Sequence, residues 1–127
     1  MKKLSFIGCG HLAKCLISGL SKDAEIEISG YDIFQGSLDW LVNNGHSALS
    51  IDDCCKNANI IFLCVKPQDL PDLCGNLSRV TREGQEIISV AAGVKLEKLN
   101  ELLPRTKITR VMTNVGTKDN LGVTAIY

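Results

Sequence analysis

A glycine-containing motif directly follows the first apolar run of the sequence. The run reads Leu4-Ser5-Phe6-Ile7, and the motif reads Gly8-Cys9-Gly10-His11-Leu12-Ala13. The first glycine permits a tight turn from a strand into a helix, the second lets a diphosphate approach the backbone, and the small third residue lets the helix pack on the strand. Free N–H groups at the start of the helix would then bind the anion. The motif therefore predicts a pyrophosphate site; the alternative is an ordinary strand–helix turn.

An acidic residue follows the second apolar run. Asp32 stands where an acid can accept a hydrogen bond from the 2′-hydroxyl of an adenosine ribose, and its carboxylate would repel a 2′-phosphate. No Arg or Lys occurs from Ile33 to Trp40 to neutralise such a phosphate. We therefore expect NAD(H) to be favoured over NADP(H). The alternative is a solvated acid in a loop.

Two more groups stand where later predicted strands end, and ligands of open α/β sheets bind at that edge. Lys66-Pro67 follows one apolar run, and Ala91-Ala92-Gly93 follows the next. The small residues would let a nicotinamide or its ribose approach closely. The alternatives are a surface cation and a plain turn, and Asp69 is a candidate cap for the following helix.

These residues need an alternating pattern of strands and helices to bring them together. Runs rich in Ile, Val and Phe predict strands near 3–8, 26–31, 47–49, 60–65, 86–90 and 108–112, with an extended piece at 123–127. Leucines and other apolar residues at helical spacing lie between them: Leu12, Cys15, Leu16 and Leu20, then Leu38, Leu41 and Val42, then Leu70, Leu73 and Leu77, then Leu96, Leu99, Leu102 and Leu103. We expect a Rossmann-type, doubly wound α/β fold, with a mostly parallel sheet, helices on both faces and a single domain spanning 1–127.

Composition excludes several classes of partner. Lys plus Arg and Asp plus Glu both number 14, so we expect no nucleic acid or anionic membrane as partner. The most apolar run, 60–65, is too short to span a bilayer. The cysteines lack zinc-site spacing, so we expect no metal, free buried thiols and a cytoplasmic protein; they are Cys9, Cys15, Cys54, Cys55, Cys64 and Cys74.

Four blocks in this order resemble the N-terminal domain of pyrroline-5-carboxylate reductases, and the likeness covers the whole chain. The blocks are the glycine motif, F-L-C-V-K-P-Q at 62–68, S-V-A-A-G-V at 89–94 and R-V-M-T-N at 110–114. The glycine module also looks like that of deazaflavin-dependent NADP reductases, which lack this combination. The resemblance implies reduction of the imine Δ1-pyrroline-5-carboxylate to L-proline by a nicotinamide cofactor, the last step of proline synthesis.

The resemblance also implies positions for individual residues. Val65, Lys66 and Pro67 would line the nicotinamide half of the cofactor, with Ala91, Ala92 and Gly93 beside them. Met112 and Asn114 would lie where cofactor meets substrate. The chain departs from the family at 115–117, where Val-Gly-Thr replaces the usual Thr-Pro-Ala or Thr-Pro-Val. No general acid is assigned, so the catalytic residues stay unknown, and His11 is expected to be a hydrogen-bond donor or a neutral spacer.

The family has a second, helical domain that forms the dimer and completes the substrate pocket, and this sequence lacks it. We therefore expect a small-molecule substrate, poor catalysis by this chain alone, and a homo-oligomer only when that domain is present. Two alternatives remain open. One is a stand-alone dinucleotide-binding or sensing module without catalysis, since fold does not fix function. The other is a reductase of a related cyclic imine, which the departure at 115–117 permits.

Overall fold

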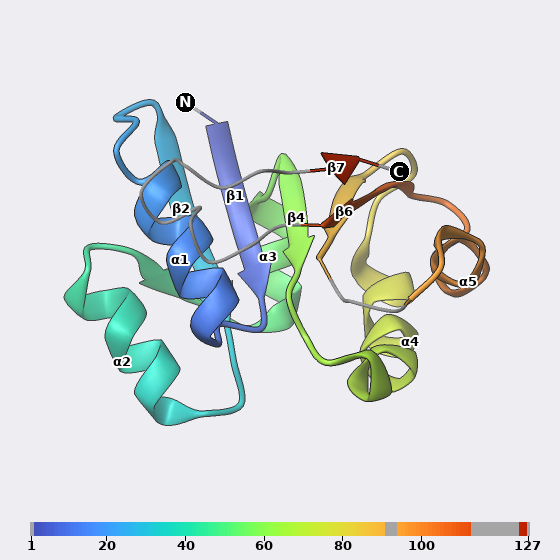
Figure 1. The fold of residues 1–127 in the computed structure, drawn as a ribbon, viewed down its shortest axis with the longest axis horizontal. Coiled ribbons are helices and arrows are strands. Elements are labelled where there is room, and N and C mark those ends of the chain that lie inside the picture. Colours follow the sequence, from blue (N-terminus) through green and yellow to red (C-terminus); the bar gives the residue numbers. More distant parts are fainter. Residues whose placement is uncertain (1, 91–93, 113–124, 127) are drawn as a thin grey trace.

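The apolar runs of the sequence form the strands of one sheet, and the segments between them form helices (Figure 1). The computed structural model describes residues 2–90, 94–112 and 125–126. The strands are β1 (Lys2–Ile7), β2 (Ile26–Tyr31), β3 (Ser47–Ala48), β4 (Ile60–Leu63), β5 (Glu86–Ser89), β6 (Lys107–Met112) and β7 (Ala125–Ile126). The helices are α1 (His11–Leu20), α2 (Gln35–Asn43), α3 (Ile51–Asn57), α4 (Leu70–Val80) and α5 (Leu96–Leu102), and a 3₁₀ turn, η1 (Pro67–Asp69), precedes α4.

The strand order in the sheet is β3-β2-β1-β4-β5-β6-β7. All neighbouring strands are parallel except β6 and β7, which are antiparallel. The chain therefore moves outward from β1 in one direction, returns across it, and moves outward in the other, which is the doubly wound topology. The predicted fold class is confirmed.

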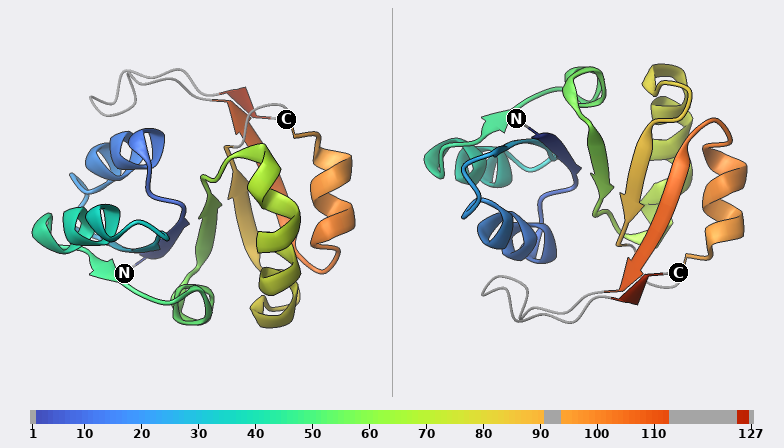
Figure 2. Two further views of the ribbon diagram at one scale, coloured as in Figure 1. Left: turned by 90° about the horizontal axis from the view of Figure 1, so that it is seen from below. Right: turned by 90° about the horizontal axis from the view of Figure 1, so that it is seen from above.

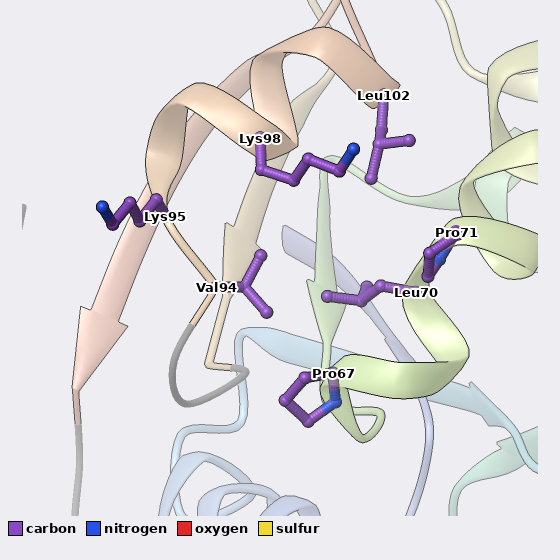
Figure 3. A pocket seen from close by; sticks show the side chains of 7 residues that line it. All are labelled: Pro67, Leu70, Pro71, Val94, Lys95, Lys98 and Leu102. Atoms are coloured by element: carbon purple, nitrogen blue, oxygen red, sulfur yellow. The ribbon is translucent and has the colours of Figure 1, made fainter.

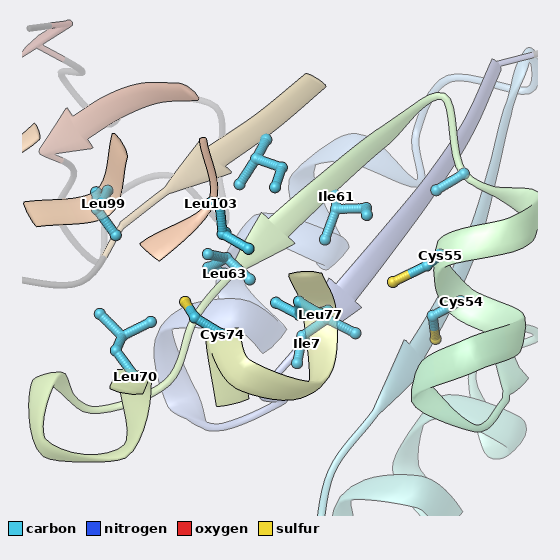
Figure 4. Packing of buried hydrophobic residues seen from close by; sticks show 12 residues of the cluster. Ile7, Cys54, Cys55, Ile61, Leu63, Leu70, Cys74, Leu77, Leu99 and Leu103 are labelled. Atoms are coloured by element: carbon cyan, nitrogen blue, oxygen red, sulfur yellow. The ribbon is translucent and has the colours of Figure 1, made fainter. Parts of the chain in front are cut away.

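Helices cover both faces of the sheet (Figure 2). Each face has its own apolar core. On one face, Phe6 packs with Ala13 and Ile17 of α1 and Leu41 of α2. On the other face, residues of β1, β4 and β5 pack against α3, α4 and α5 (Figure 4): Ile7, Ile61, Leu63, Ile87, Cys54, Cys55, Leu70, Cys74, Leu77, Leu99 and Leu103. Because β1 lies between these cores, residues 4–7 are buried on both sides, which explains why Leu4, Phe6 and Ile7 are all apolar.

The only polar side chain in that buried stretch is Ser5, and it is fully hydrogen-bonded. Its hydroxyl shares a 2.7 Å hydrogen bond with Ser29 Oγ and donates to the Cys54 carbonyl oxygen at 3.0 Å. These bonds compensate the lost hydration of the hydroxyl. They also connect β1 to β2 and to α3, so Ser5 contributes to the position of the strand that carries the glycine motif.

Helix α3 was not predicted. Its first turn is stabilised by Ser50, whose Oγ accepts the Asp53 N–H at 3.1 Å, and by the acids Asp52 and Asp53 next to the positive end of the helix dipole. Cys54 and Cys55 form its buried face. A seven-residue helix is too short for an apolar period to reveal, although the Ser-x-x-Asp pattern of its cap was visible in the sequence.

The other differences are small. Val42, predicted to lie on the buried face of α2, is 60% exposed, and the buried residues of that helix are Ser37 and Leu41. Strand ends differ from the predicted ones by one or two residues. Five of the six cysteines are buried free thiols, as expected, and Cys64 is half-buried. Within the described ranges, no helix has the length and apolar character needed to cross a membrane.

Candidate functional site

A cleft of about 540 Å³ opens at the carboxyl ends of β1, β2 and β4. Strand β1 pairs with β2 on one side and with β4 on the other, so the cleft lies where the strand order reverses. Ligands of doubly wound sheets bind at this point. The lining residues are Ile7, Gly8, Gly10, Tyr31, Asp32, Ile33, Phe34, Ser37, Ile51, Cys64, Val65, Lys66, Asp69, Asp72, Leu73 and Asn76.

The turn at Gly8 requires a glycine for two reasons. Its φ is +92°, a conformation that residues with a side chain rarely adopt. A Cβ atom at this position would also lie 2.8 Å from the Cys64 carbonyl oxygen and 2.8 Å from Val65 Cγ1. The Gly8 N–H donates to the Tyr31 carbonyl oxygen at 2.9 Å. The turn therefore packs directly against the end of β4 and is fixed to the end of β2.

Gly10 differs from Gly8, because a Cβ atom there would have no neighbour within 4 Å. Gly10 is the N-cap of α1 and provides no capping side chain, and the first turn of α1 contains no acid. The first backbone bond of the helix joins the Lys14 N–H to the Gly10 carbonyl oxygen at 3.0 Å. The N–H groups of residues 11–13 therefore have no acceptor within the helix. These donors and the positive end of the helix dipole suit an anion such as a pyrophosphate.

The remaining motif residues have different environments. Cys9 is fully buried in the core, where burial raises the pKa of its thiol to about 12 and keeps it protonated. Ala13 is 1% exposed and packs in the same core. Leu12 is half-buried, and the exposed His11 has its Nε2 3.8 Å from Cys15 Sγ. Only the two glycines of the motif line the cleft, so Cys9 and Ala13 act through packing and any contact from them must come from the backbone.

Asp32 lines the cleft beyond the end of β2, and both of its carboxylate oxygens accept backbone N–H groups. Oδ2 accepts the Cys9 N–H at 2.7 Å, and Oδ1 accepts the Phe34 N–H at 3.0 Å. A carboxylate offers about four acceptor positions, so two remain for a ligand. The acid is therefore part of the glycine turn as well as of the cleft wall.

At the end of β4, Val65 and Lys66 line the cleft. Lys66 is exposed and forms no salt bridge within the described ranges, where the one ion pair joins Lys98 and Glu101. Pro67 does not line the cleft. It borders a second, smaller groove of about 290 Å³ between α4 and α5, together with Leu70, Pro71, Val94, Lys95, Lys98 and Leu102 (Figure 3). Asp69 occupies the N-cap position of α4, but its side chain makes no capping hydrogen bond.

Several cleft residues were not anticipated from the sequence. Ile33 and Phe34 are 79% and 69% exposed and line the cleft directly after Asp32. Their apolar character in a loop was a visible signal for a ligand-facing surface. Ile51 and Leu73 come from α3 and α4, and only the tertiary arrangement brings them to the cleft.

Part of the predicted site lies outside the described residues. This applies to Ala91, Ala92 and Gly93, to Asn114, and to the departure at 115–117. Met112 is the last residue of β6, and its side chain is likewise outside the description.

Sequence comparison with known proteins finds relatives among oxidoreductases. Residues 3–93 match the model of the family described as "NADP oxidoreductase coenzyme F420-dependent". The chain belongs to this family. Among curated relatives of the chain, the pyrroline-5-carboxylate reductase of Haemophilus influenzae is 31% identical over 99% of the chain and 48% of that protein. That of Methanosarcina acetivorans is 31% identical over 91% of the chain and 45% of that protein. The resemblance found in the sequence is thereby confirmed.

Solved structures of pyrroline-5-carboxylate reductases share the fold of this chain. A pyrroline-5-carboxylate reductase from Coxiella burnetii superimposes with a TM-score of 0.87 and 25% identity, over 97% of this chain and 48% of that one. The enzyme of Plasmodium falciparum, solved with NADP bound, has a TM-score of 0.85 and 22% identity, over 99% of this chain and 47% of that one. The chain spans about half the length of the curated relatives it matches.

Proposed function

We propose that this chain is the cofactor-binding domain of an NAD(P)H-dependent reductase that converts the imine Δ1-pyrroline-5-carboxylate, or a related cyclic imine, to the saturated ring. The observation that carries the proposal is the meeting of three features in one cleft: the Gly8 turn, the uncapped start of α1 and the carboxylate of Asp32. The similarity to pyrroline-5-carboxylate reductases supports the choice of substrate.

Different residues of the cleft would bind different parts of the dinucleotide. The free N–H groups at the start of α1 would hold the pyrophosphate, and the open space beside Gly10 lets it approach the backbone. Ile33 and Phe34 would cover an adenine ring, and Asp32 would accept the 2′-hydroxyl of its ribose. Val65 and Lys66 would contact the nicotinamide half. When bound, a nicotinamide cofactor supplies the hydride, and this chain holds and orients it.

We also propose that NAD(H) is favoured over NADP(H). Three carboxylates line the cleft, those of Asp32, Asp69 and Asp72, against a single ammonium, that of Lys66. An additional 2′-phosphate would bring two further negative charges into this surrounding, at an electrostatic cost. The NADP-bound structure from Plasmodium falciparum shows which cofactor that protein accepts; the charges in this cleft support a different preference here.

The substrate half of the site is part of the same proposal. A second, helical domain would provide the pocket that holds the imine carbon near the nicotinamide and would form a homo-oligomer. Orienting two reactants in this way lowers a barrier by several kcal/mol. The cytoplasmic location suggested by the free thiols also belongs here. We therefore expect negligible turnover of pyrroline-5-carboxylate by residues 1–127 alone, even when NADH is bound.

Calorimetric titration of the purified chain with NADH and with NADPH tests both parts. We expect a saturable site for NADH and weaker binding of NADPH. If neither cofactor binds at millimolar concentration, the proposed function is wrong. If NADPH binds as tightly as NADH or more tightly, only the preference is wrong. Robust turnover by the isolated chain would contradict the need for a second domain.

A further inference from the structure

One carboxylate joins two loops that both line the cleft. The glycine turn follows β1, and the Ile33–Phe34 loop follows β2. Asp32 Oδ2 accepts the Cys9 N–H from the first loop at 2.7 Å, and Oδ1 accepts the Phe34 N–H from the second at 3.0 Å. Hydrogen bonds to an ionised acceptor are short and about twice as strong as neutral ones.

The bond to Cys9 determines which donors remain for a ligand. Gly8 N–H is already bonded to Tyr31, and Cys9 N–H is bonded to Asp32. The free donors of the motif therefore begin after Cys9, at the start of α1. The Cys9 side chain is fully buried in the core. Cys9 is therefore held both by core packing of its side chain and by the hydrogen bond from its N–H to the Asp32 carboxylate. Together, the hydrogen bond and the core packing of Cys9 restrain the backbone direction at Gly10, the N-cap of α1.

We propose that Asp32 is a positioning residue for the whole dinucleotide, in addition to being a ribose ligand. Its carboxylate fixes the glycine turn that presents the pyrophosphate donors and, through Phe34, the apolar wall that would cover the adenine. This inference rests on the proposed function. It differs from the ribose role in one respect: a ribose ligand affects only cofactors with a free hydroxyl on the adenosine ribose, whereas a positioning residue affects every cofactor that uses the turn.

The test compares Asp32→Leu with the unmodified chain, using NADH and its analogue with 2′,3′-dideoxyadenosine, whose adenosine ribose has no hydroxyl for the carboxylate to accept. Leu is similar in size and has no acceptor. The loss of a negative charge favours the binding of an anionic ligand, so electrostatics cannot account for a weaker affinity for the analogue. We expect the analogue to bind about tenfold more weakly to the variant, because two backbone N–H groups lose a charged acceptor. Affinity is measured well below the melting temperature, so reduced fold stability alone does not change it.

Amide hydrogen exchange of Cys9 provides a second readout that needs no ligand. We expect exchange at this amide to accelerate in Asp32→Leu. Asp23→Leu is the matched control, because its carboxylate also accepts a backbone N–H, that of Glu25 at 2.9 Å, but in an exposed loop away from the cleft. The control should leave both the affinity and the Cys9 exchange rate unchanged. If Asp32→Leu does not fold, Asp32→Asn, which loses one acceptor oxygen, should weaken the analogue about threefold.

The outcomes separate this inference from the function on which it rests. If the analogue binds the Asp32 variant as tightly as the unmodified chain, or if Cys9 exchange is unchanged, Asp32 does not position the turn. If the unmodified chain binds no dinucleotide, the proposed function fails. The exchange rate of Cys9 then still shows whether the carboxylate fixes the turn.

Discussion

Helices α1 and α3 begin at the same cleft, but their N-termini are built differently. Helix α3 follows Ser50, whose hydroxyl accepts a backbone N–H, and it carries two acids in its first turn. Helix α1 follows Gly10, which offers no acceptor, and its first turn has no acid. Residues of both starts, Gly10 and Ile51, line the cleft. The chain thus satisfies the donors of α3 with its own side chains and leaves those of α1 open, as an anion site requires.

The largest expected effect is a loss of stability at high pH. It involves residues near both helix starts and so tests a property in which the two starts do not differ. Buried thiols lie at each: Cys9, with a pKa raised to about 12, and Cys54 and Cys55, with pKa values raised to about 11 and about 12, all because burial disfavours the thiolate. In the unfolded chain these thiols ionise near pH 9, whereas the folded state keeps them protonated. Their contribution to stability is therefore fully present below pH 9 and is lost as the pH rises toward 11. Burial raises the pKa of Cys64 and Cys74 in the same way, so all five thiols contribute. Urea denaturation should therefore show a free energy of unfolding lower by roughly 7 kcal/mol at pH 10 than at pH 8. An unchanged value would contradict the burial of these thiols.

Next in size is Gly8→Ala, which introduces a methyl group into the turn before α1. We expect the free energy of unfolding to fall by about 3 kcal/mol, from a positive φ and from the close approach to Cys64 and Val65. Gly45→Ala is the matched control, because its φ is +83° but a Cβ atom there would meet nothing within 4 Å. The control should cost about 1 kcal/mol. Equal losses in the two variants, measured by chemical denaturation, would show that packing against β4 is not what requires Gly8.

Gly10→Ser converts the start of α1 into the kind of start that α3 has. The new hydroxyl would accept one of the free N–H groups and occupy the space beside the backbone. We expect the melting temperature to stay the same or rise, because Ser is a favourable N-cap, and the affinity for NADH to fall about tenfold. Gly75→Ser, at an exposed position of α4 where a Cβ atom also meets nothing within 4 Å, should leave the affinity unchanged. Undiminished NADH binding by Gly10→Ser would remove the start of α1 from the site.

The reverse change at α3 should have the smallest effect. Ser50→Ala removes the cap and should lower the free energy of unfolding by about 1 kcal/mol, with no change in affinity for NADH. Thermal denaturation and the same titration measure both quantities. A loss of affinity larger than twofold would mean that α3 shapes the cleft more directly than its contacts indicate.

The sequence predicted the parts of this molecule that depend on local pattern. The central strand around Phe6, the amphipathic helices and the glycine turn each have a period or a motif that a short window reveals. The doubly wound, mostly parallel sheet was predicted from the alternation of strands and helices, whereas the strand order came only from the structure. Helix α3 was missed because seven residues with two buried cysteines show no clear period.

The site was predicted only in outline. Residue types that can bind or react are recognisable in a sequence, whereas the residues that line a cleft depend on how the elements pack. Asp32 and Lys66 were identified by their charge and by their place after a strand. The hydrogen bond from the Cys9 N–H to Asp32 was not predicted, since it joins residues of two loops that are 23 positions apart in the sequence. The resemblance implied that Pro67 lines the nicotinamide half of the cofactor; in the structure Pro67 begins the turn η1 and lines the groove beside α5.

The central place of β1 has a consequence for the order in which the site can form during synthesis. The Lys3 N–H donates to Asn59 Oδ1 at 2.7 Å across 56 residues, and Leu4 pairs with Ile60. A nascent chain that ends before β4 already contains the glycine turn and Asp32, but it lacks the strand against which that turn packs. Closing such a long loop is slow compared with forming a helix. The cofactor would therefore be excluded from early folding intermediates, and its binding would report on completion of the β1–β4 pair.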